Sequence, residues 1–119
     1  MLFLIYLKIK RKNNKKNKKI MIKTVTKISA EWCQPCKVYA KTFHKVEEME
    51  EFKNIEFKEI DIENDEEGET IAEKYQIRSV PTTLLFDEEN TLIYKISGNI
   101  SKEDLITTIN NAMKDNSND

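Results

Sequence analysis

The sequence predicts an α/β domain with a four-stranded mixed sheet flanked by helices, in the order β-α-β-α-β-β-α. Segments rich in β-branched residues alternate with segments whose apolar residues recur every three or four positions. The strand–helix–strand unit at the start requires a parallel pair with a right-handed crossover. A hairpin near the other end adds antiparallel strands. A chain of 119 residues has room for one such domain.

The first half of the domain contains two strands and a long helix. Residues 21–29 are rich in Ile, Val and Thr and predict the first strand. Residues 55–62 predict the second strand, with apolar alternation over their first half. Between them, residues 34–52 predict a helix from an apolar stripe at three- and four-residue steps: Cys36, Tyr39, Ala40, Phe43, Val46, Met49 and Phe52.

The second half begins with a short acidic helix, capped by Asn64 or Asp65 and ending near Tyr75. Residues 82–87 and 91–96 predict two strands, and the turn 88–90 between them makes a hairpin. The pattern Ser101-x-x-Asp104 resembles a capping box and predicts the last helix. Its apolar stripe is Leu105, Ile106, Ile109, Ala112 and Met113. Residues 115–119 are expected to be a frayed tail.

The net charge of −1 conceals a basic leader and an acidic body. Residues 1–20 contain eight Lys and Arg and no acid, whereas residues 21–119 contain 12 bases and 21 acids. A weak membrane contact and a basic arm for nucleic acid are the functional alternatives for this leader. We expect instead that it is disordered, or that translation starts at Met21 and the leader is not part of the native product. The domain is then residues 21–114.

The composition, and the order of the charged and apolar segments along the chain, exclude several classes of protein. The apolar fraction is 39% and Gly and Pro number two each, which excludes collagen and a Pro/Gly-rich disordered chain. The apolar run at residues 2–7 is too short to span a membrane, and its charges follow it rather than precede it as in a secretory signal. We therefore expect a cytoplasmic protein, in a compartment that keeps thiols reduced.

Both cysteines lie where the first strand meets the first helix, in Trp32-Cys33-Gln34-Pro35-Cys36-Lys37. Thiols at this spacing are one helical turn apart and can close a small disulfide. The unpaired N–H groups and the positive end of the dipole at a helix N-terminus favour a thiolate, which is the nucleophilic form. Cys33 is the predicted nucleophile, and Cys36, expected to be less exposed, is the predicted resolving thiol.

Two other interpretations of the cysteine pair are weaker. A structural zinc site needs four ligands, and the single histidine, His44, is too far along the helix to complete one. A metal cluster shared between two chains, which together would supply four thiolates, is a further alternative. Two buried cysteines acting as small hydrophobes are the structural alternative, but Trp32, Pro35 and Lys37 argue against it. We expect no metal.

The stretch Ala30-Glu31-Trp32-Cys33-Gln34-Pro35-Cys36-Lys37 resembles the active site of the thioredoxin family. The resemblance continues through Tyr75-x-Ile77-Arg78-Ser79-Val80-Pro81-Thr82-Thr83-Leu84-Leu85-Phe86 and then Ser97-Gly98. It covers nearly everything from residue 21 to about residue 114. It implies a minimal thioredoxin fold in which the Val80–Pro81 bond is cis and Pro81 lies against the disulfide. It further implies an apolar substrate-binding patch around Cys33, made by Trp32, Gln34, Pro35, Val80 and Gly98.

The sequence departs from the family pattern at several positions. The buried Asp six residues before the first Cys is Lys27 here, which could stabilise a thiolate, point to solvent, or pair with Glu59 or Glu56 on the neighbouring strand. Lys27, Glu59 and Lys37 are candidate modulators. Gln34 replaces the usual Gly and Lys41 the usual helix-kinking proline. The usual first strand and helix are absent, since Cys33 follows Met21 by only 12 positions.

The resemblance implies reduction of protein disulfides by dithiol–disulfide exchange, without a metal or organic cofactor. It implies a recycling thioredoxin reductase or similar enzyme, and targets such as ribonucleotide reductase. We expect a monomer that carries electrons for cell redox homeostasis and binds no nucleic acid. A thioredoxin-fold binding or scaffold subunit, and a disulfide oxidase or isomerase, are the competing functions.

Overall fold

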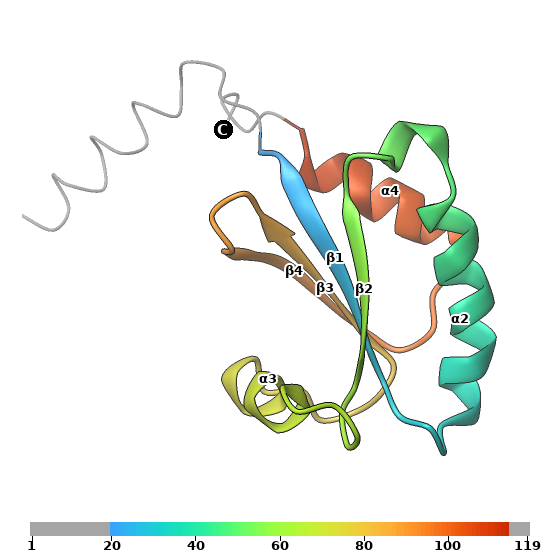
Figure 1. Ribbon diagram of the computed structural model, residues 1–119. Helices are drawn as coiled ribbons and strands as arrows, with labels where there is room; N and C mark the ends of the chain where they lie inside the picture. The colour runs from blue at the N-terminus through green and yellow to red at the C-terminus, as the bar shows by residue number, and fades with distance from the viewer. Residues whose placement is uncertain (1–19, 115–119) are drawn as a thin grey trace, which may run out of the picture.

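The computed structural model describes residues 20–114. The predicted tail, and the predicted leader apart from its last residue, lie outside the described residues. Four strands form one sheet in the order β2-β1-β3-β4 (Figure 1): β1 (Ile22–Ser29), β2 (Glu56–Asp61), β3 (Thr82–Asp87) and β4 (Leu92–Ser97). β1 is parallel to β2 and antiparallel to β3, and β3 and β4 are antiparallel. The predicted mixed sheet and element order are confirmed.

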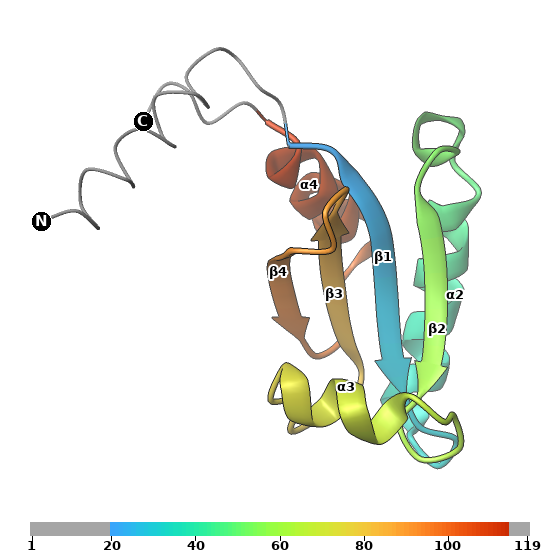
Figure 2. The ribbon, with the colours of Figure 1, turned by 60° about the vertical axis from the view of Figure 1, so that its left-hand side comes forward.

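Helices cover both faces of this sheet. α2 (Gln34–Glu47) and α4 (Lys102–Ala112) pack on one face, whereas α3 (Gly68–Lys74) packs on the other (Figure 2). α2 and α4 each bury an apolar stripe against the strands, which is the usual reason for such a layered arrangement, and α3 packs through the half-buried Ile71. The core between the sheet and the α2–α4 layer contains Ile22, Val25, Tyr39, Phe43, Val46, Phe52, Leu85, Leu105, Ile109 and Ala112.

Two helix boundaries differ from the prediction. The first helix ends at Glu47, because Met49 is extended and a separate 3₁₀ turn, η1 (Glu50–Phe52), follows. Phe52 still reaches the core and is 1% exposed. α3 starts at Gly68 rather than at an Asn64 or Asp65 cap, because the Asp61 carboxylate accepts the backbone N–H groups of residues 63 and 64 and holds that segment in turns.

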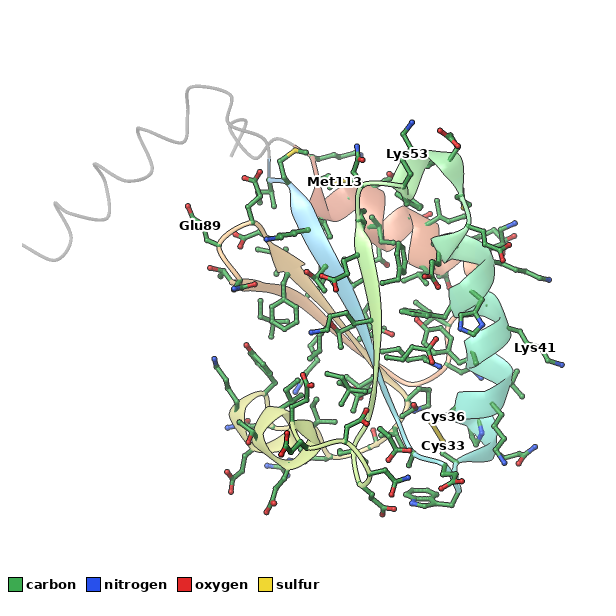
Figure 3. The ribbon with its side chains drawn as sticks, viewed as in Figure 1. Cys33, Cys36, Lys41, Lys53, Glu89 and Met113 are labelled. Carbon is green, nitrogen blue, oxygen red and sulfur yellow. A yellow bond between two sulfur atoms is a disulfide. The ribbon has the colours of Figure 1, made fainter. Side chains whose placement is uncertain are left out.

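Alternation along β1 divides its side chains between the two layers. Val25 belongs to the core under α2, and Lys27, two residues on, has its ammonium 5.5 Å from the centre of the Phe43 ring. Ile28 points to the opposite face and packs with the α3 layer. The β1–α2 junction places Cys33 and Cys36 at one end of the sheet, far from Met113 at the other end (Figure 3).

Candidate active site

The two cysteines form a disulfide at the N-terminus of α2. Cys33 is the N-cap residue, and its sulfur accepts the backbone N–H of Cys36 at 3.1 Å. Pro35 lies in the first turn, where its missing N–H costs no helical hydrogen bond. The first turn contains no acidic side chain. The helix N-terminus therefore presents donors and a positive dipole end to the Cys33 sulfur, which favour its thiolate after reduction.

The two cysteines are equally buried, at 3% exposure each, and pack with Ala30, Ile62 and Val80. The expectation that Cys36 would be the less exposed thiol is therefore wrong for this oxidised form, because the disulfide holds the Cys33 sulfur against Val80. Trp32 beside them is 65% exposed. Gln34 and Pro35 are also exposed, so an accessible rim borders the buried disulfide.

The Val80–Pro81 bond is cis, as the resemblance implied. The Val80 carbonyl oxygen lies 3.6 Å from the Cys33 sulfur, and Pro81 is buried. Gly98 has a φ of +92°, a conformation that favours glycine, and its N–H donates to the Pro81 carbonyl at 2.8 Å. These contacts bring the Pro81 loop and the Gly98 loop together beside the disulfide.

Asn99 also contributes to this arrangement, and sequence reasoning missed it. Its side-chain N–H donates to the Pro35 carbonyl at 3.3 Å and so joins the Gly98 loop to the first turn of α2. The contact spans 64 residues, and no local pattern in the sequence signals it.

Lys27 is buried at 3% exposure, so the alternative in which it points to solvent is wrong. Its Nζ lies 3.4 Å from Glu59 Oε1, across the β1–β2 register, which confirms Glu59 rather than Glu56 as its partner, although the Glu59 side chain is itself 44% exposed. The second Glu59 oxygen lies 2.5 Å from His44 Nε2. Nothing in the sequence signalled this partner for His44.

Several physical effects act on the Glu59 carboxyl. Burial raises its pKa, but the hydrogen bond from His44 and the charge of Lys27 outweigh burial, so the pKa lies below its usual value. Glu59 is thus an ionised partner for Lys27 at neutral pH. The other candidate modulator, Lys37, is exposed on α2, and its role stays a prediction.

Neither a metal cluster nor a membrane-spanning helix is found among the described residues. Residues 20–114 contain no group of three or more His, Cys, Asp or Glu side chains arranged to hold a metal ion. Over the same range, no helix has the length and apolar character needed to cross a bilayer.

Comparison with known proteins agrees with this geometry. The thioredoxin family model matches residues 8–111. The thioredoxin of Pongo abelii is 31% identical over 86 residues, which are 72% of this chain and 76% of that protein. Thioredoxin Asp f 29 of Aspergillus fumigatus is 43% identical over 60 residues, so the match spans about half of each chain, 50% of this one and 52% of the other.

Solved structures give the same result for the fold. The thioredoxin of Malassezia sympodialis matches with a TM-score of 0.65 and 25% identity, over 75% of this chain and 73% of that one. A thioredoxin-2 described as a component of malaria parasite protein secretion machinery matches with a TM-score of 0.66 and 26% identity, over 80% and 86%. The family match over most of the sequence, together with the Cys33–Cys36 disulfide beside cis-Pro81, shows that the chain belongs to the thioredoxin family.

Proposed function

We propose that this protein reduces disulfide bonds in other proteins by dithiol–disulfide exchange. The observation that carries the proposal is the Cys33–Cys36 disulfide at the N-terminus of α2, with the Val80 carbonyl beside it. A two-electron couple of this kind needs no metal or organic cofactor, because the two sulfurs themselves hold and release the electrons.

The exchange proceeds in two balanced steps. The Cys33 thiolate of the reduced protein attacks one sulfur of the substrate disulfide, forms a mixed disulfide and releases the other sulfur as a thiolate, which takes a proton from water. Cys36 then loses its proton to water and attacks the Cys33 sulfur. This closes the Cys33–Cys36 disulfide and releases the second substrate thiolate. Two electrons have passed from the protein to the substrate.

The proposed substrate-binding patch comprises the exposed residues around the disulfide and the two loops that contain Val80 and Gly98. Trp32, Gln34 and Pro35 offer accessible surface beside the disulfide, and Val80 and Gly98 border it. We place an extended segment of the substrate along Val80, where its chain can pair as an added strand and bring its disulfide to Cys33.

The redox cycle requires a recycling partner. The oxidised protein must receive two electrons from a dithiol donor, and a thioredoxin reductase or similar enzyme fits this need. Ribonucleotide reductase is a proposed target, and the cytoplasm, where thiols are kept reduced, is the proposed location.

Insulin reduction tests the proposed function. With dithiothreitol as electron donor, the wild-type protein should accelerate insulin precipitation, and Cys33→Ser should reduce the rate to that of dithiothreitol alone. Cys36→Ser should accumulate a mixed disulfide with insulin, visible by mass spectrometry, because Cys33 can attack but nothing displaces it.

A control and two contrary outcomes make this test decisive. Lys41→Gln, which changes an exposed residue of α2, should behave as wild type. Equal rates for wild type and Cys33→Ser would instead indicate a binding or scaffold subunit. If the Cys33–Cys36 disulfide oxidised the thiols of reduced insulin more readily than dithiothreitol reduced the disulfide, the protein would be an oxidase or isomerase.

A further inference from the structure

The segment that brings Val80 to the disulfide lies between two regular elements and belongs to neither. Residues 76–80, called the connecting segment below, join the end of α3 to the cis-Pro81 bend at the start of β3. The Val80 carbonyl at the far end of this segment is 3.6 Å from the Cys33 sulfur. Because the segment has neither helical nor ladder hydrogen bonds along its length, contacts at its two ends hold Val80 in place.

The far end of the connecting segment is attached to the sheet. The Thr82 hydroxyl, at the start of β3, donates a hydrogen bond to the Ser79 carbonyl at 2.7 Å. Gly98 directly follows β4, and its N–H donates to the Pro81 carbonyl at 2.8 Å. These two contacts fix the segment on the side of the disulfide.

The near end of the connecting segment is held by a lysine from β4. Lys95 Nζ donates hydrogen bonds to the Tyr75 carbonyl at 3.1 Å and to the Gln76 carbonyl at 3.3 Å. The C-terminal end of α3 lies next to β4 in Figure 2, so the lysine reaches it directly. The last carbonyls of a helix have no partner within the helix, and a cation is favoured beside them by the helix dipole.

The backbone at the start of the connecting segment needs such support. Gln76 has a φ of +53°, in the left-handed region that costs free energy for a residue with a Cβ. The next N–H, of Ile77, donates back to the Ala72 carbonyl at 2.9 Å, as at many helix ends that contain a left-handed residue. A residue keeps this conformation where the contacts around it hold it. The hydrogen bond from Lys95 to the Gln76 carbonyl is one of these contacts.

We propose that Lys95 is a positioning residue for substrate binding. Its ammonium holds the start of the connecting segment, and this keeps the Val80 backbone where the chain of the substrate pairs with it. β4 then controls both ends of the segment, through Lys95 at the start and through Gly98 beside Pro81. The proposal rests on the proposed exchange reaction and on the placement of the substrate along Val80.

The position of Lys95 separates its role from the chemistry of the sulfurs. Its register partner on β3 is Leu84, which packs in the apolar cluster on the α3 side of the sheet. The Lys95 side chain therefore lies on that side and contacts backbone carbonyls rather than the disulfide. Its loss should weaken the binding of a peptide chain and leave the intrinsic reactivity of Cys33 unchanged.

The test compares a protein substrate with a small disulfide that has no peptide backbone. Lys95→Met keeps most of the apolar stem of the side chain and removes the ammonium. With dithiothreitol in excess, the KM for insulin should rise about two- to fivefold, the equivalent of one hydrogen bond at the surface, and kcat should stay unchanged. The reduced variant should react with hydroxyethyl disulfide at the wild-type rate in a single turnover followed by mass spectrometry.

Two further variants identify the cause of the change in KM. Lys95→Arg keeps a cation with several N–H donors, so it should retain the wild-type KM. Lys58→Met removes the same charge from an exposed position on β2, the opposite edge strand, and should also retain it. A rise in KM shared by either variant would overturn the proposal. Equal slowing of insulin and hydroxyethyl disulfide by Lys95→Met would also overturn it, because Lys95 would then act on the whole fold or on Cys33.

Amide hydrogen exchange measures the position of the connecting segment without any substrate. In Lys95→Met, the amides of residues 77–80 should exchange faster than in wild type, and those of β1 should exchange at the wild-type rate. Unchanged exchange at residues 77–80 would contradict the proposal. A wild-type protein that fails to reduce insulin would contradict the exchange reaction itself, whereas an active wild type with the same KM as Lys95→Met would refute the role of Lys95 alone.

Discussion

Two hydroxyl groups meet in the core directly beneath α2. Tyr39 is fully buried, and its hydroxyl lies 2.7 Å from Thr83 Oγ1 on β3. Burial raises the pKa of Tyr39, and the hydrogen bond to Thr83 only partly opposes this, so the phenol stays neutral. The pair connects the active-site helix to the strand that follows Pro81.

Tyr39→Phe should lower the free energy of unfolding by about 1 to 2 kcal/mol, because it leaves the buried Thr83 hydroxyl without its partner. Urea unfolding of the oxidised protein measures this. In Tyr39→Phe/Thr83→Val both polar partners are gone, so the double variant should recover part of the loss. If the decrease in the free energy of unfolding of the double variant equalled the sum of the decreases in the two single variants, the two hydroxyls would not interact.

The ionisation of Glu59 should make the free energy of unfolding depend on pH. Burial raises its pKa, but the His44 hydrogen bond and the Lys27 charge together lower it below its usual value. A carboxyl with a lower pKa in the folded chain stabilises the fold above its unfolded value, about 4.3, and this contribution disappears as the pH falls through the folded value. At pH 6, Glu59→Gln should cost about 1 to 3 kcal/mol, since the Lys27 ammonium stays buried without its counter-charge.

The difference in free energy of unfolding between wild type and Glu59→Gln should shrink as the pH falls below about 4.3, because the wild-type carboxyl is then increasingly protonated. Urea unfolding at a series of pH values gives both curves. Glu56→Gln, at an exposed position of the same strand, is the matched control. If the Glu59→Gln variant remained less stable than wild type by the same amount throughout the acid range, the ion pair would not be the cause of the difference.

At the residue level, the sequence predicted contacts that follow from local spacing. The Cys33–Cys36 pair and the helix N-terminus under it are set by four consecutive residues, so the motif was sufficient to predict them. The Lys27–Glu59 pair was one of the two options that strand alignment left open. His44 with Glu59, and Asn99 with Pro35, join elements far apart in the chain, and only the folded backbone brings them together.

At the level of secondary structure, the last helix follows its sequence signals closely. Ser101 is the N-cap of α4, and its side-chain oxygen accepts the N–H of Asp104 at 3.0 Å. Ser101→Ala should lower the free energy of unfolding by about 1 kcal/mol, the usual cost of losing such a cap. Lys102→Ala, at the next position, which is also exposed, should cost under about 0.5 kcal/mol in the same urea titration. Equal losses for the two variants would contradict a capping role.

The other helix boundaries show where sequence signals fail. No Pro or Gly separates α2 from η1, and the apolar stripe continues to Phe52, so periodicity alone could not locate the break at Met49. Glycine occupies the first position of α3, because the chain passes very close to a neighbouring carbonyl there. A Cβ on Gly68 would lie 2.5 Å from the Ile62 oxygen. That approach is a property of the fold and was invisible in the local pattern.

For the whole molecule, the sheet divides the interior into two layers, and the disulfide packs against Ile62 and Val80, which also belong to the layer on the α3 side. The α2–α4 side holds the larger core, and the α3 side holds a smaller one around Ile28, Ile60 and Leu84. Local rules predicted the parallel β1–β2 pair and the β3–β4 hairpin. The central β1–β3 pairing joins segments more than 50 residues apart, and burial of both faces, rather than any turn, selects it.

The redox state should change the stability of the whole domain. The Cys33–Cys36 link closes a loop of four residues, with a sequence separation of 3. Loop-closure entropy for so short a loop corresponds to about 2 kcal/mol at 25 °C in favour of the oxidised protein. The cysteines pack with Ala30, Ile62 and Val80, so the stabilised end is the one that joins β1, α2 and the Pro81 loop.

Urea unfolding of the wild-type protein with and without a reductant should therefore give a lower midpoint for the reduced form, by an amount equivalent to about 2 kcal/mol. Cys33→Ser/Cys36→Ser cannot form the link, so its midpoint should not respond to the reductant. If the reduced wild type were the more stable form, the dithiol would gain contacts that the disulfide lacks. The protein would then hold its two electrons tightly as the dithiol, and its disulfide would oxidise substrates rather than the dithiol reduce them, because stability of the reduced fold and oxidising power are thermodynamically linked.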